Sequence, residues 1–359
     1  MKELLVICLC ILSPTLVFTQ YSTVVPITPS YINNDHNFGF SLFMDNDTIY
    51  IGSPGESDLN GAQPLCGALY STIINANDVT DMKRIQQNCY FGRGFGFEVT
   101  KDRFGQLQVF NERRKAVRTS NYLFISNMES TISIIALDSL FSSHDTIIQR
   151  PDFVYQRSRF GYGLAANDDW LFVGVPYLDG EMYAEGGVVV YKRTENDWNF
   201  HQRIKPPFVN TSTYFGGSVH LIDNQLFVGA MSQNIDSIQA AGAVFVYNLD
   251  NDTFQLSQQL ISPFVHDYAN FGFSMTGSDN HLYIGAPNDN TIEKRGGCVY
   301  VFSNDQGNWN FENTIFSPEV RVGAQFGFTI KKKGPRLLVS AINDFVDGYR
   351  SGKVYLFKE

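Results

Sequence analysis

Six of the Phe-Gly pairs in this chain recur at nearly constant intervals. They begin at Phe38, Phe95, Phe160, Phe215, Phe271 and Phe326, and successive pairs lie 57, 65, 55, 56 and 55 residues apart. Regular spacing of this size is the sequence signature of a repeat architecture. The chain is therefore expected to consist of six copies of one supersecondary unit.

The copy at residues 271–302 shows the unit most clearly. FGFSMT is followed by the polar turn Ser278-Asp279-Asn280, HLYIGAP is a second apolar run, and GGCVYVF is a third. Runs rich in β-branched and aromatic residues predict strands, and the short polar turn predicts a hairpin. A longer polar loop, 288–295, separates the second run from the third. In most copies a fourth run follows and ends in a proline before the next Phe-Gly.

Four antiparallel strands per unit, repeated around a ring, are typical of a β-propeller. We predict an all-β propeller of four-stranded antiparallel blades, six by the repeat count, with seven as the alternative. The second copy is the least regular. There FGFEV and GQLQVFN match the first two strands, NYLFISN is assigned to the third, and 129–145 is interpreted as an irregular insertion before the fourth.

The two ends of the mature chain complement each other. The sixth copy finishes after its third strand, at GKVYLFKE, and the segment TVVPITPSYI has no earlier strands of its own. Pro29 lies nine residues before Phe38, as Pro206 does before Phe215. We therefore predict that the N-terminal segment supplies the outer strand of the last blade, which closes the ring and leaves no free edge there.

The first twenty residues are expected to be a secretory signal peptide. One lysine precedes an apolar run that is short and interrupted by Ser13-Pro14, which fits a signal better than a membrane span. Residues 21–359 then form a single extracellular domain with no membrane span. Three glycosylation sequons, at Asn46, Asn210 and Asn251, agree with secretion.

Three cysteines remain after the signal. A hairpin around Asn77-Asp78 would set Cys66 opposite Cys89, and opposed residues of neighbouring strands are close enough for a disulfide. We predict that this pair is oxidised. Cys298 takes the place of Val188 and Ala243 in other copies and is expected to be a buried free thiol.

Composition and spacing argue against several classes of function. The 359-residue chain is 43% hydrophobic with a formal net charge of -9, which disfavours nucleic acid as a partner. The six histidines fall singly in different units, so neither a zinc site nor a catalytic grouping is predicted. The acidic turns have two or three residues, too few to surround Ca²⁺. We expect no metal and no cofactor, although spacing does not test a site that converges from different blades.

In a propeller, the loops between the second and third strands share one face with the loops that join successive blades. Both sets are long here and rich in tyrosine, a residue that suits protein recognition because it gives contact area at modest entropic cost. The candidate binding residues are Tyr155, Tyr177, Asp179, Tyr183, Tyr214, Tyr268 and Tyr349, with Tyr31 on the same loops.

The pattern FGFS…YIGAP…GGCVYVF resembles the FG-GAP repeat of integrin α-subunit propellers over essentially the whole mature chain. The first copy, with CGALYS and the later Cys89, is similar to the first integrin blade. Two features depart from the family pattern: six repeats are counted where integrins have seven, and the acidic calcium loops between the first two strands are missing. The resemblance implies a free-standing extracellular propeller that binds a protein.

The leading hypothesis is a secreted, non-enzymatic propeller that binds a protein or extracellular-matrix ligand through its long loops. A glycan is a possible ligand, and a carbohydrate-binding lectin is the first alternative. Trp198 and Trp309 recur only in the fourth strands of two copies, whereas repeated lectin pockets usually place the same residue in every copy. The second alternative is a hydrolase or lyase with its site on the propeller axis.

Overall fold

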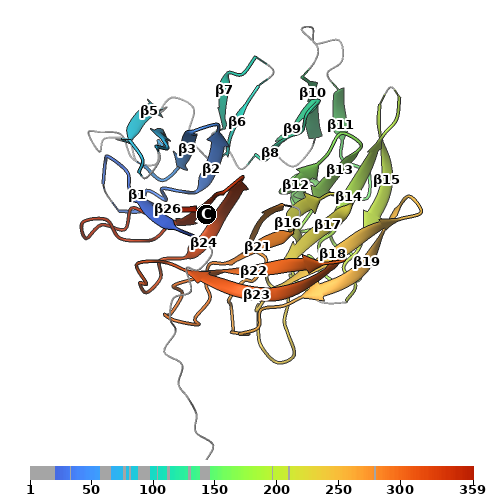
Figure 1. Ribbon diagram of the computed structural model, residues 1–359. Helices are drawn as coiled ribbons and strands as arrows, with labels where there is room; N and C mark the ends of the chain where they lie inside the picture. The colour runs from blue at the N-terminus through green and yellow to red at the C-terminus, as the bar shows by residue number, and fades with distance from the viewer. Residues whose placement is uncertain are drawn as a thin grey trace, which may run out of the picture.

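The protein forms a ring of antiparallel β-sheets around a central axis, as Figure 1 shows. The structure is a computed structural model. It describes residues 21–32, 34–56, 66–75, 78–80, 82–87, 98–102, 104–110, 114–127, 131–137, 146–195, 197–208, 211–278 and 280–359. The predicted signal peptide lies outside these residues. Six sheets have four strands each, so the all-β fold class and the six four-stranded blades are confirmed.

The blades are numbered in chain order, with strands given from the axis outward. Blade 1 holds β2 (Ser41–Asp45), β3 (Thr48–Ser53), β4 (Ala68–Ile73) and β5 (Lys83–Gln87). Blade 2 holds β8 (Ala116–Arg118), β9 (Tyr122–Asn127), β10 (Thr131–Ala136) and β11 (Thr146–Gln149). Blade 3 holds β12 (Gly163–Ala166), β13 (Trp170–Gly174), β14 (Val188–Arg193) and β15 (Trp198–Ile204).

Blade 4 holds β16 (Phe215–Ile222), β17 (Gln225–Ala230), β18 (Ala243–Asp250) and β19 (Thr253–Leu260). Blade 5 holds β20 (Ser274–Ser278), β21 (His281–Ala286), β22 (Cys298–Asp305) and β23 (Asn308–Phe316). Blade 6 holds β24 (Phe326–Lys333), β25 (Arg336–Ala341), β26 (Lys353–Lys358) and β1 (Thr23–Ile27). A short 3-10 turn, η2 (Gln156–Ser158), precedes blade 3.

A two-stranded sheet, β6 (Glu98–Lys101) and β7 (Leu107–Phe110), lies between blades 1 and 2. Its inner strand β6 contacts β2 on one side and β8 on the other. The innermost strands therefore follow one another around the axis as β2, β6, β8, β12, β16, β20 and β24, and β24 meets β2 again. The ring has seven inner strands, of which six belong to four-stranded blades in the described part of the chain.

The second copy is divided differently from the prediction. FGFEV and GQLQVFN contribute β6 and β7, but NYLFISN is β9, the second strand of blade 2, rather than the third strand of their own blade. The stretch 129–145 also contains a regular strand, β10. The cause is local: this copy lacks the loop with Gly-Ala-Pro and the glycine pair, and a turn at 119–121 pairs β9 with the nearer β8.

The ring closes through its N-terminal strand, as predicted. β1 pairs with β26 in antiparallel register, with Val25 opposite Leu356 and Ile27 opposite Val354. Val25 and Ile27 are buried between blades 6 and 1, where they pack with Phe38 and Leu338. The last blade is thus completed by residues from the other end of the mature chain.

Truncation of β1 tests this closure. We expect that deleting residues 21–30 from the mature chain lowers the thermal unfolding midpoint sharply, because it exposes the edge of β26 and the apolar surface under Ile27. Ile27→Ala is the milder form and is expected to cost about 2–5 kcal/mol of unfolding free energy. The matched control is Pro26→Ser, on the exposed side of the same strand, which should change stability by about 0.5 kcal/mol or less.

The repeated glycines let the backbones of neighbouring blades touch. Gly242, just before β18, has φ +90° and lies against Phe271 of the next blade, whose amide donates to the Ala241 carbonyl at 2.9 Å. The same bond joins Phe326 to Gly296 at 2.9 Å and Phe38 to Ser351 at 3.0 Å. A Cβ on Gly242 would overlap the Phe271 carbonyl oxygen. The Phe-Gly and Gly-Gly motifs are therefore two halves of one interblade joint.

A comparison of two glycines with nearly equal φ can distinguish the energetic cost of the close approach from the cost of backbone strain alone. Gly242→Ala and Gly348→Ala both place alanine at positive φ, +90° and +86°, but only Gly242 has atoms within reach of the new Cβ. We expect Gly348→Ala to cost about 1–2 kcal/mol of unfolding free energy from strain alone. Gly242→Ala should cost clearly more in the same denaturant titration; equal losses would contradict the joint.

Farther from the axis, outer strands are held by aromatic side chains and glutamines. Phe254 of β19 meets Phe172 of blade 3 edge to face at 4.9 Å, and Trp309 of β23 meets Phe227 of blade 4 at 5.2 Å. Gln258 of β19 donates to the Trp309 carbonyl at 2.7 Å and accepts from its amide at 2.9 Å. Blades are thus bonded to each other from the axis to the rim.

Candidate functional site

One face of the ring carries most of the long loops that the structure describes. They are the loops between the second and third strands of a blade (175–187, 231–242, 288–297 and 342–352) and the loops that enter the next blade (28–37, 150–159, 205–214, 261–270 and 317–325). We call this surface the long-loop face. Every tyrosine predicted as a binding residue lies on it, as does Asp179, and the placement of these residues follows from the strand order.

Backbone hydrogen bonds join the two sets of loops to each other. The Ser212 amide donates to the Tyr183 carbonyl at 3.0 Å, and the Tyr268 amide donates to the Gln239 carbonyl at 2.7 Å. The same connection recurs from Gly323 to Lys294 at 2.9 Å and from Asp35 to Arg350 at 2.9 Å. Four of the five entering loops are therefore fastened to the loop of the blade before them, and the loop 150–159 is bonded to the loop of its own blade, from the Tyr177 amide to the Ser158 carbonyl at 3.2 Å.

The predicted tyrosines divide into exposed and packed side chains. Tyr155, Tyr183, Tyr268 and Tyr349 are exposed, by 58%, 63%, 59% and 48%. Tyr177 and Tyr214 are half-buried and pack on each other, with ring centroids 4.9 Å apart. The first four can contact a partner directly, whereas the last two form part of the support beneath them.

Charged groups hold the packed tyrosines in place. The guanidinium of Arg159 lies 4.4 Å above the Tyr177 ring, a distance at which a cation is attracted to the π-face. Arg157 donates to the Asp179 carboxylate at 2.7 Å, and this carboxylate also accepts the Ala184 amide at 3.0 Å. The Ala184 amide and Arg157 together lower the pKa of Asp179. Asp179 therefore orders its own loop.

The long-loop face also collects most of the exposed apolar side chains found in loops. Besides the four exposed tyrosines, these are Met182, Ile261, Phe264, Ile292, Val320 and Val322. On the opposite face, Phe104 in the β6–β7 turn is exposed by 65%. Concentration of exposed apolar groups on one side is typical of an interaction surface.

Three of the loops each contain a buried tyrosine–carboxylate hydrogen bond that the sequence analysis missed. The hydroxyl of Tyr300 in β22 donates to Asp289 at 2.8 Å, and both residues are buried. Tyr70 donates to Glu56 at 2.7 Å, and Tyr355 to Asp344 at 2.7 Å, from the same positions of other copies. Burial raises the pKa of Glu56 and of Asp344, while the tyrosine hydrogen bonds oppose that rise.

The pairing signal was present in the aligned copies. In the copies whose third strand has tyrosine at this position, the fifth residue counted from the glycine position of the Gly-Ala-Pro segment is acidic. In the copy with Val190 at the tyrosine position, the fifth residue is Leu178, and in the copy with Phe245 it is Gln233. The backbone is the same in all these copies. The amide of the glycine before the third strand donates to the carbonyl of this fifth residue, for example Gly352 to Asp344 at 2.9 Å and Gly242 to Gln233 at 2.9 Å.

The energetic role of the pair can be measured against an unpaired tyrosine. Tyr300→Phe removes the donor to a carboxylate that is 2% exposed, so we expect a loss of about 1–3 kcal/mol of unfolding free energy. Tyr247 is equally buried, but its hydroxyl has no hydrogen-bond partner. Tyr247→Phe is accordingly expected to be neutral or stabilising. A similar loss in both variants, measured by urea titration, would contradict the role of the hydrogen bond.

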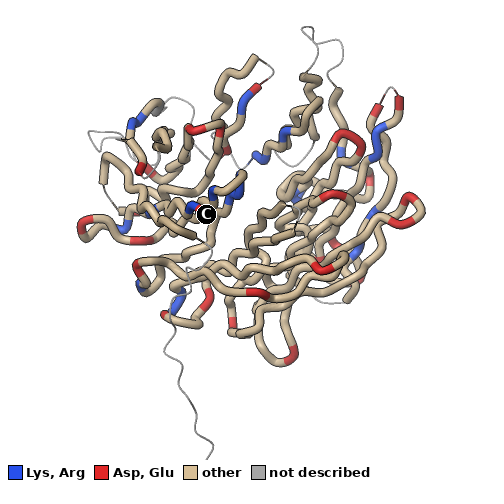
Figure 2. The backbone as a smooth tube through the Cα atoms, in the orientation of Figure 1, with Lys and Arg blue, Asp and Glu red and all other residues tan. Residues whose placement is uncertain are grey.

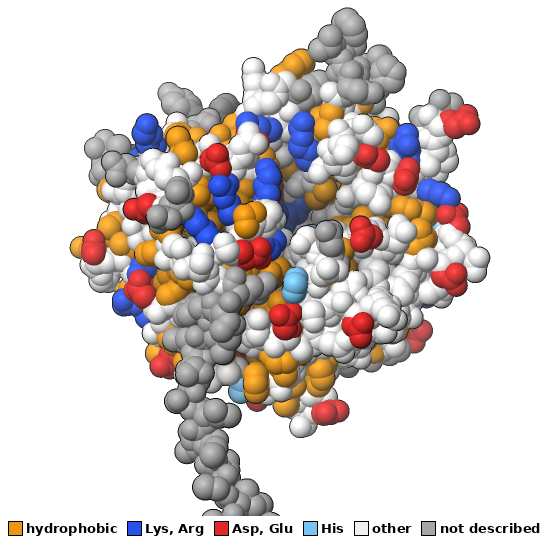
Figure 3. Space-filling view, in the orientation of Figure 1, with side chains coloured by type: hydrophobic (Ala, Val, Ile, Leu, Met, Phe, Trp, Pro, Cys, Tyr) orange, Lys and Arg blue, Asp and Glu red, His pale blue; other side chains and the backbone are white. Residues whose placement is uncertain are grey.

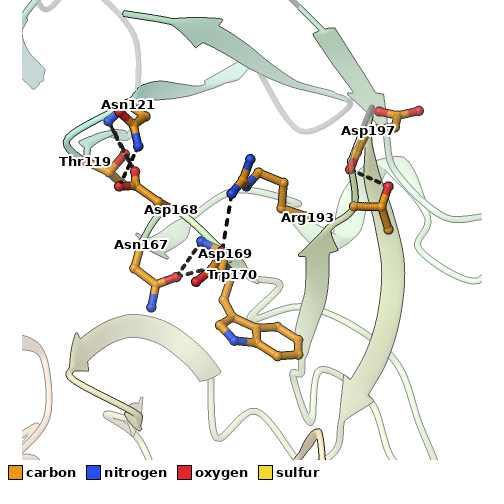
Figure 4. A network of polar contacts seen from close by, with 9 residues as sticks. Thr119, Asn121, Asn167, Asp168, Asp169, Trp170, Arg193 and Asp197 are labelled. Carbon is orange, nitrogen blue, oxygen red and sulfur yellow. Dashed lines mark hydrogen bonds and ion pairs between the residues drawn. The ribbon is translucent and has the colours of Figure 1, made fainter.

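The short acidic turns on the opposite face act as hairpin turns. Figure 4 shows the β12–β13 turn, where the Asn167 side chain accepts the amides of Asp169 and Trp170 at 3.0 and 2.8 Å. Asp168 accepts hydrogen bonds from Thr119 at 2.5 Å and from the Asn121 side chain at 2.9 Å. These carboxylate oxygens tie blade 3 to blade 2.

Among the described residues, His, Cys, Asp and Glu side chains form no group of three or more that could hold a metal ion.

The modification sites fall partly within the described residues. Asn46 and Asn251 are exposed in short turns, whereas Asn210 lies outside the described residues. Cys66 is buried, and Ala68 pairs with Gln87 in the register that the predicted Cys66–Cys89 bridge requires. Cys89 lies outside the described residues, so the bridge remains a prediction. Cys298 is buried and free, as expected.

In the part of the chain that the structure describes, no helix is long and apolar enough to span a bilayer.

The comparisons with known proteins identify the fold class. No protein-family model matches the chain, and no curated protein matches it in sequence. The chain is similar to the crystal structure of the β-propeller domain of Cps50 (Swd1) from Myceliophteria thermophila, at 9% identity and a TM-score of 0.53, over 93% of this chain and 100% of that one. It also matches the computationally designed Ika8 protein at 11% identity and a TM-score of 0.49, over 93% and 99% of the two chains. The protein is a β-propeller.

Proposed function

We propose that this protein is a secreted, non-enzymatic binding module that recognises an extracellular protein through its long-loop face. The observation that carries the proposal is the exposure of Tyr155, Tyr183, Tyr268 and Tyr349 on one face whose loops are already joined by backbone hydrogen bonds. A surface that is ordered before binding loses little conformational entropy on association. Exposed tyrosines supply contact area and a hydroxyl that remains solvated.

Two features of the sequence support the extracellular setting. The apolar N-terminal segment resembles a signal peptide, and the Phe-Gly and Gly-Ala-Pro motifs resemble the FG-GAP repeats of integrin α-subunits. Under this proposal the chain acts as an adhesion-type propeller head. Glycans on Asn46 and Asn251 would lie in short turns on the opposite side and leave the long-loop face accessible.

A binding assay with matched aromatic substitutions tests the proposal. The secreted mature chain is titrated against a panel of purified extracellular-matrix and cell-surface proteins, and any saturable binding is repeated with Tyr183→Ala and Tyr268→Ala. We expect at least one of these variants to lose about tenfold or more in affinity, because buried interface tyrosines commonly contribute over 1.4 kcal/mol. Phe104→Ala, an exposed aromatic on the other face, is expected to bind normally.

Two results would refute this assignment. If the Phe104 variant loses as much affinity as the tyrosine variants, binding does not use the long-loop face. If the mature chain binds no protein of the panel but binds specific glycans on an array, the carbohydrate-binding alternative replaces the proposal of protein binding.

A further inference from the structure

The inner strands bring unpaired basic groups together near the axis of the ring. His220 in β16 and Lys331 in β24 occupy the same position of their repeats, five residues after the phenylalanine of Phe-Gly, and pair with Phe227 and Leu338. The equivalent residues of blades 1, 3 and 5 are Phe43, Ala165 and Thr276. Only two of these inner-strand positions therefore carry a basic side chain, and they lie in blades 4 and 6.

Lys331 is a cation without a partner. It has no hydrogen bond or ion pair with any described residue, although protein surrounds it closely enough to lower its pKa through desolvation. Its side chain is nevertheless exposed to solvent. Its strand β24 is one of the inner strands around the axis, where Figure 3 shows a hollow that we call the axial channel. The charge of Glu98 raises the pKa of Lys331, and the charge of Lys115 lowers it, so Glu98 of β6 and Lys115, just before β8, both lie near it.

His220 faces the same space. Its Nε2 is buried and has no hydrogen-bond partner. Burial and, to a smaller extent, the charge of Lys331 lower the pKa of His220 to about 4, against the opposing effect of a hydrogen bond with the Gly277 backbone. The ring is therefore neutral near pH 7, with one nitrogen bonded and the other free.

Among the described residues, the carboxylates near Lys331 are too few to balance the cations. Glu98 is 3.5 Å from Lys115 and forms an ion pair with it, which leaves the charge of Lys331 in excess. Toward the short turns, Lys101 pairs with Asp45, Lys333 donates to the Met44 carbonyl at 3.2 Å, and Arg118 donates to the carbonyls of Lys101 and Asp102 at 3.0 Å. The cationic groups continue from the channel to its mouth.

This concentration is local, because the chain as a whole carries a formal net charge of -9. Lysine and arginine positions gather around the centre of the ring, near β24 and β8, in Figure 2. Figure 3 shows blue side chains around a central hollow on the same face. A cleft lined by one sign of charge attracts ions of the other sign and raises their local concentration.

We infer that the axial channel binds an oxyanion, a phosphate or sulfate group that is either free or at the end of a larger ligand, between Lys331, Lys115 and His220. The ammonium groups donate charge-assisted hydrogen bonds, which are stronger than neutral ones. His220 lies beside the site, and a nearby anion favours its protonated ring, in which both nitrogens donate. Binding supplies the negative charge that Glu98 alone does not.

Calorimetric titration with inorganic phosphate and with sodium sulfate, at low ionic strength and pH 6.5, tests the site. We expect saturable binding to the mature protein, and a loss of about tenfold or more in affinity for Lys331→Met, because hydrogen bonds to charged groups contribute about 1.5–3 kcal/mol. The control is Lys205→Met, an exposed lysine just after β15 that bonds to no other residue among those described. Titration with glucose 6-phosphate and glucose 6-sulfate distinguishes a free ion from the end group of a larger ligand.

Thermal unfolding supplies a second measurement that does not depend on a heat signal. Bound phosphate should raise the unfolding midpoint of the mature protein and of Lys205→Met, but not that of Lys331→Met. The inference is wrong if neither ion binds at millimolar concentration, or if Lys331→Met, folded by circular dichroism, binds both as tightly as the parent protein. Lys331→Met should retain any protein binding by the long-loop face, and Tyr183→Ala should retain phosphate binding, so the two proposals fail independently.

Discussion

The approach of one backbone to another between neighbouring blades is the constraint on which the whole ring depends. At Gly242 and Phe271, the chains are so close that one additional carbon would overlap a carbonyl oxygen. The Phe271 amide, the Phe271 side chain and the Gly242 φ of +90° all belong to this single joint. Since each joint sets the position of the next blade, the repeat must be conserved within the chain even where strands vary freely.

This constraint explains why much of the fold could be predicted from the sequence. Glycine at a crowded joint and phenylalanine in a buried wedge recur because no other residues fit, so the copies, their strands and the closure by Thr23–Ile27 were all recognisable. The second copy lost these markers. Without Gly-Ala-Pro and the glycine pair, nothing in 95–149 indicated that β6 and β7 would separate from β8 to β11.

The functional features were harder to predict, for a different physical reason. Strand order places a tyrosine on a face, but it does not say whether the ring is exposed, as in Tyr183, or stacked on a neighbour, as in Tyr177. The axial site is even harder to predict from the sequence. His220 and Lys331 are 111 residues apart in the sequence and differ in kind, and only closure of the ring brings them within electrostatic range. The tyrosine–acid pairs could have been found by comparing the copies position by position.

The pairing of β1 with β26 also dictates the order of events during synthesis. Val25 leaves the ribosome long before Leu356, its partner in the last blade. Until then, the apolar side of β1 has no surface to cover, and blades 1 and 6 each lack a neighbour. A contact between such distant parts of a chain forms slowly, because the intervening loop must close first. The ring can therefore close only after β26 has been synthesised, and the N-terminal strand needs protection from aggregation during that interval.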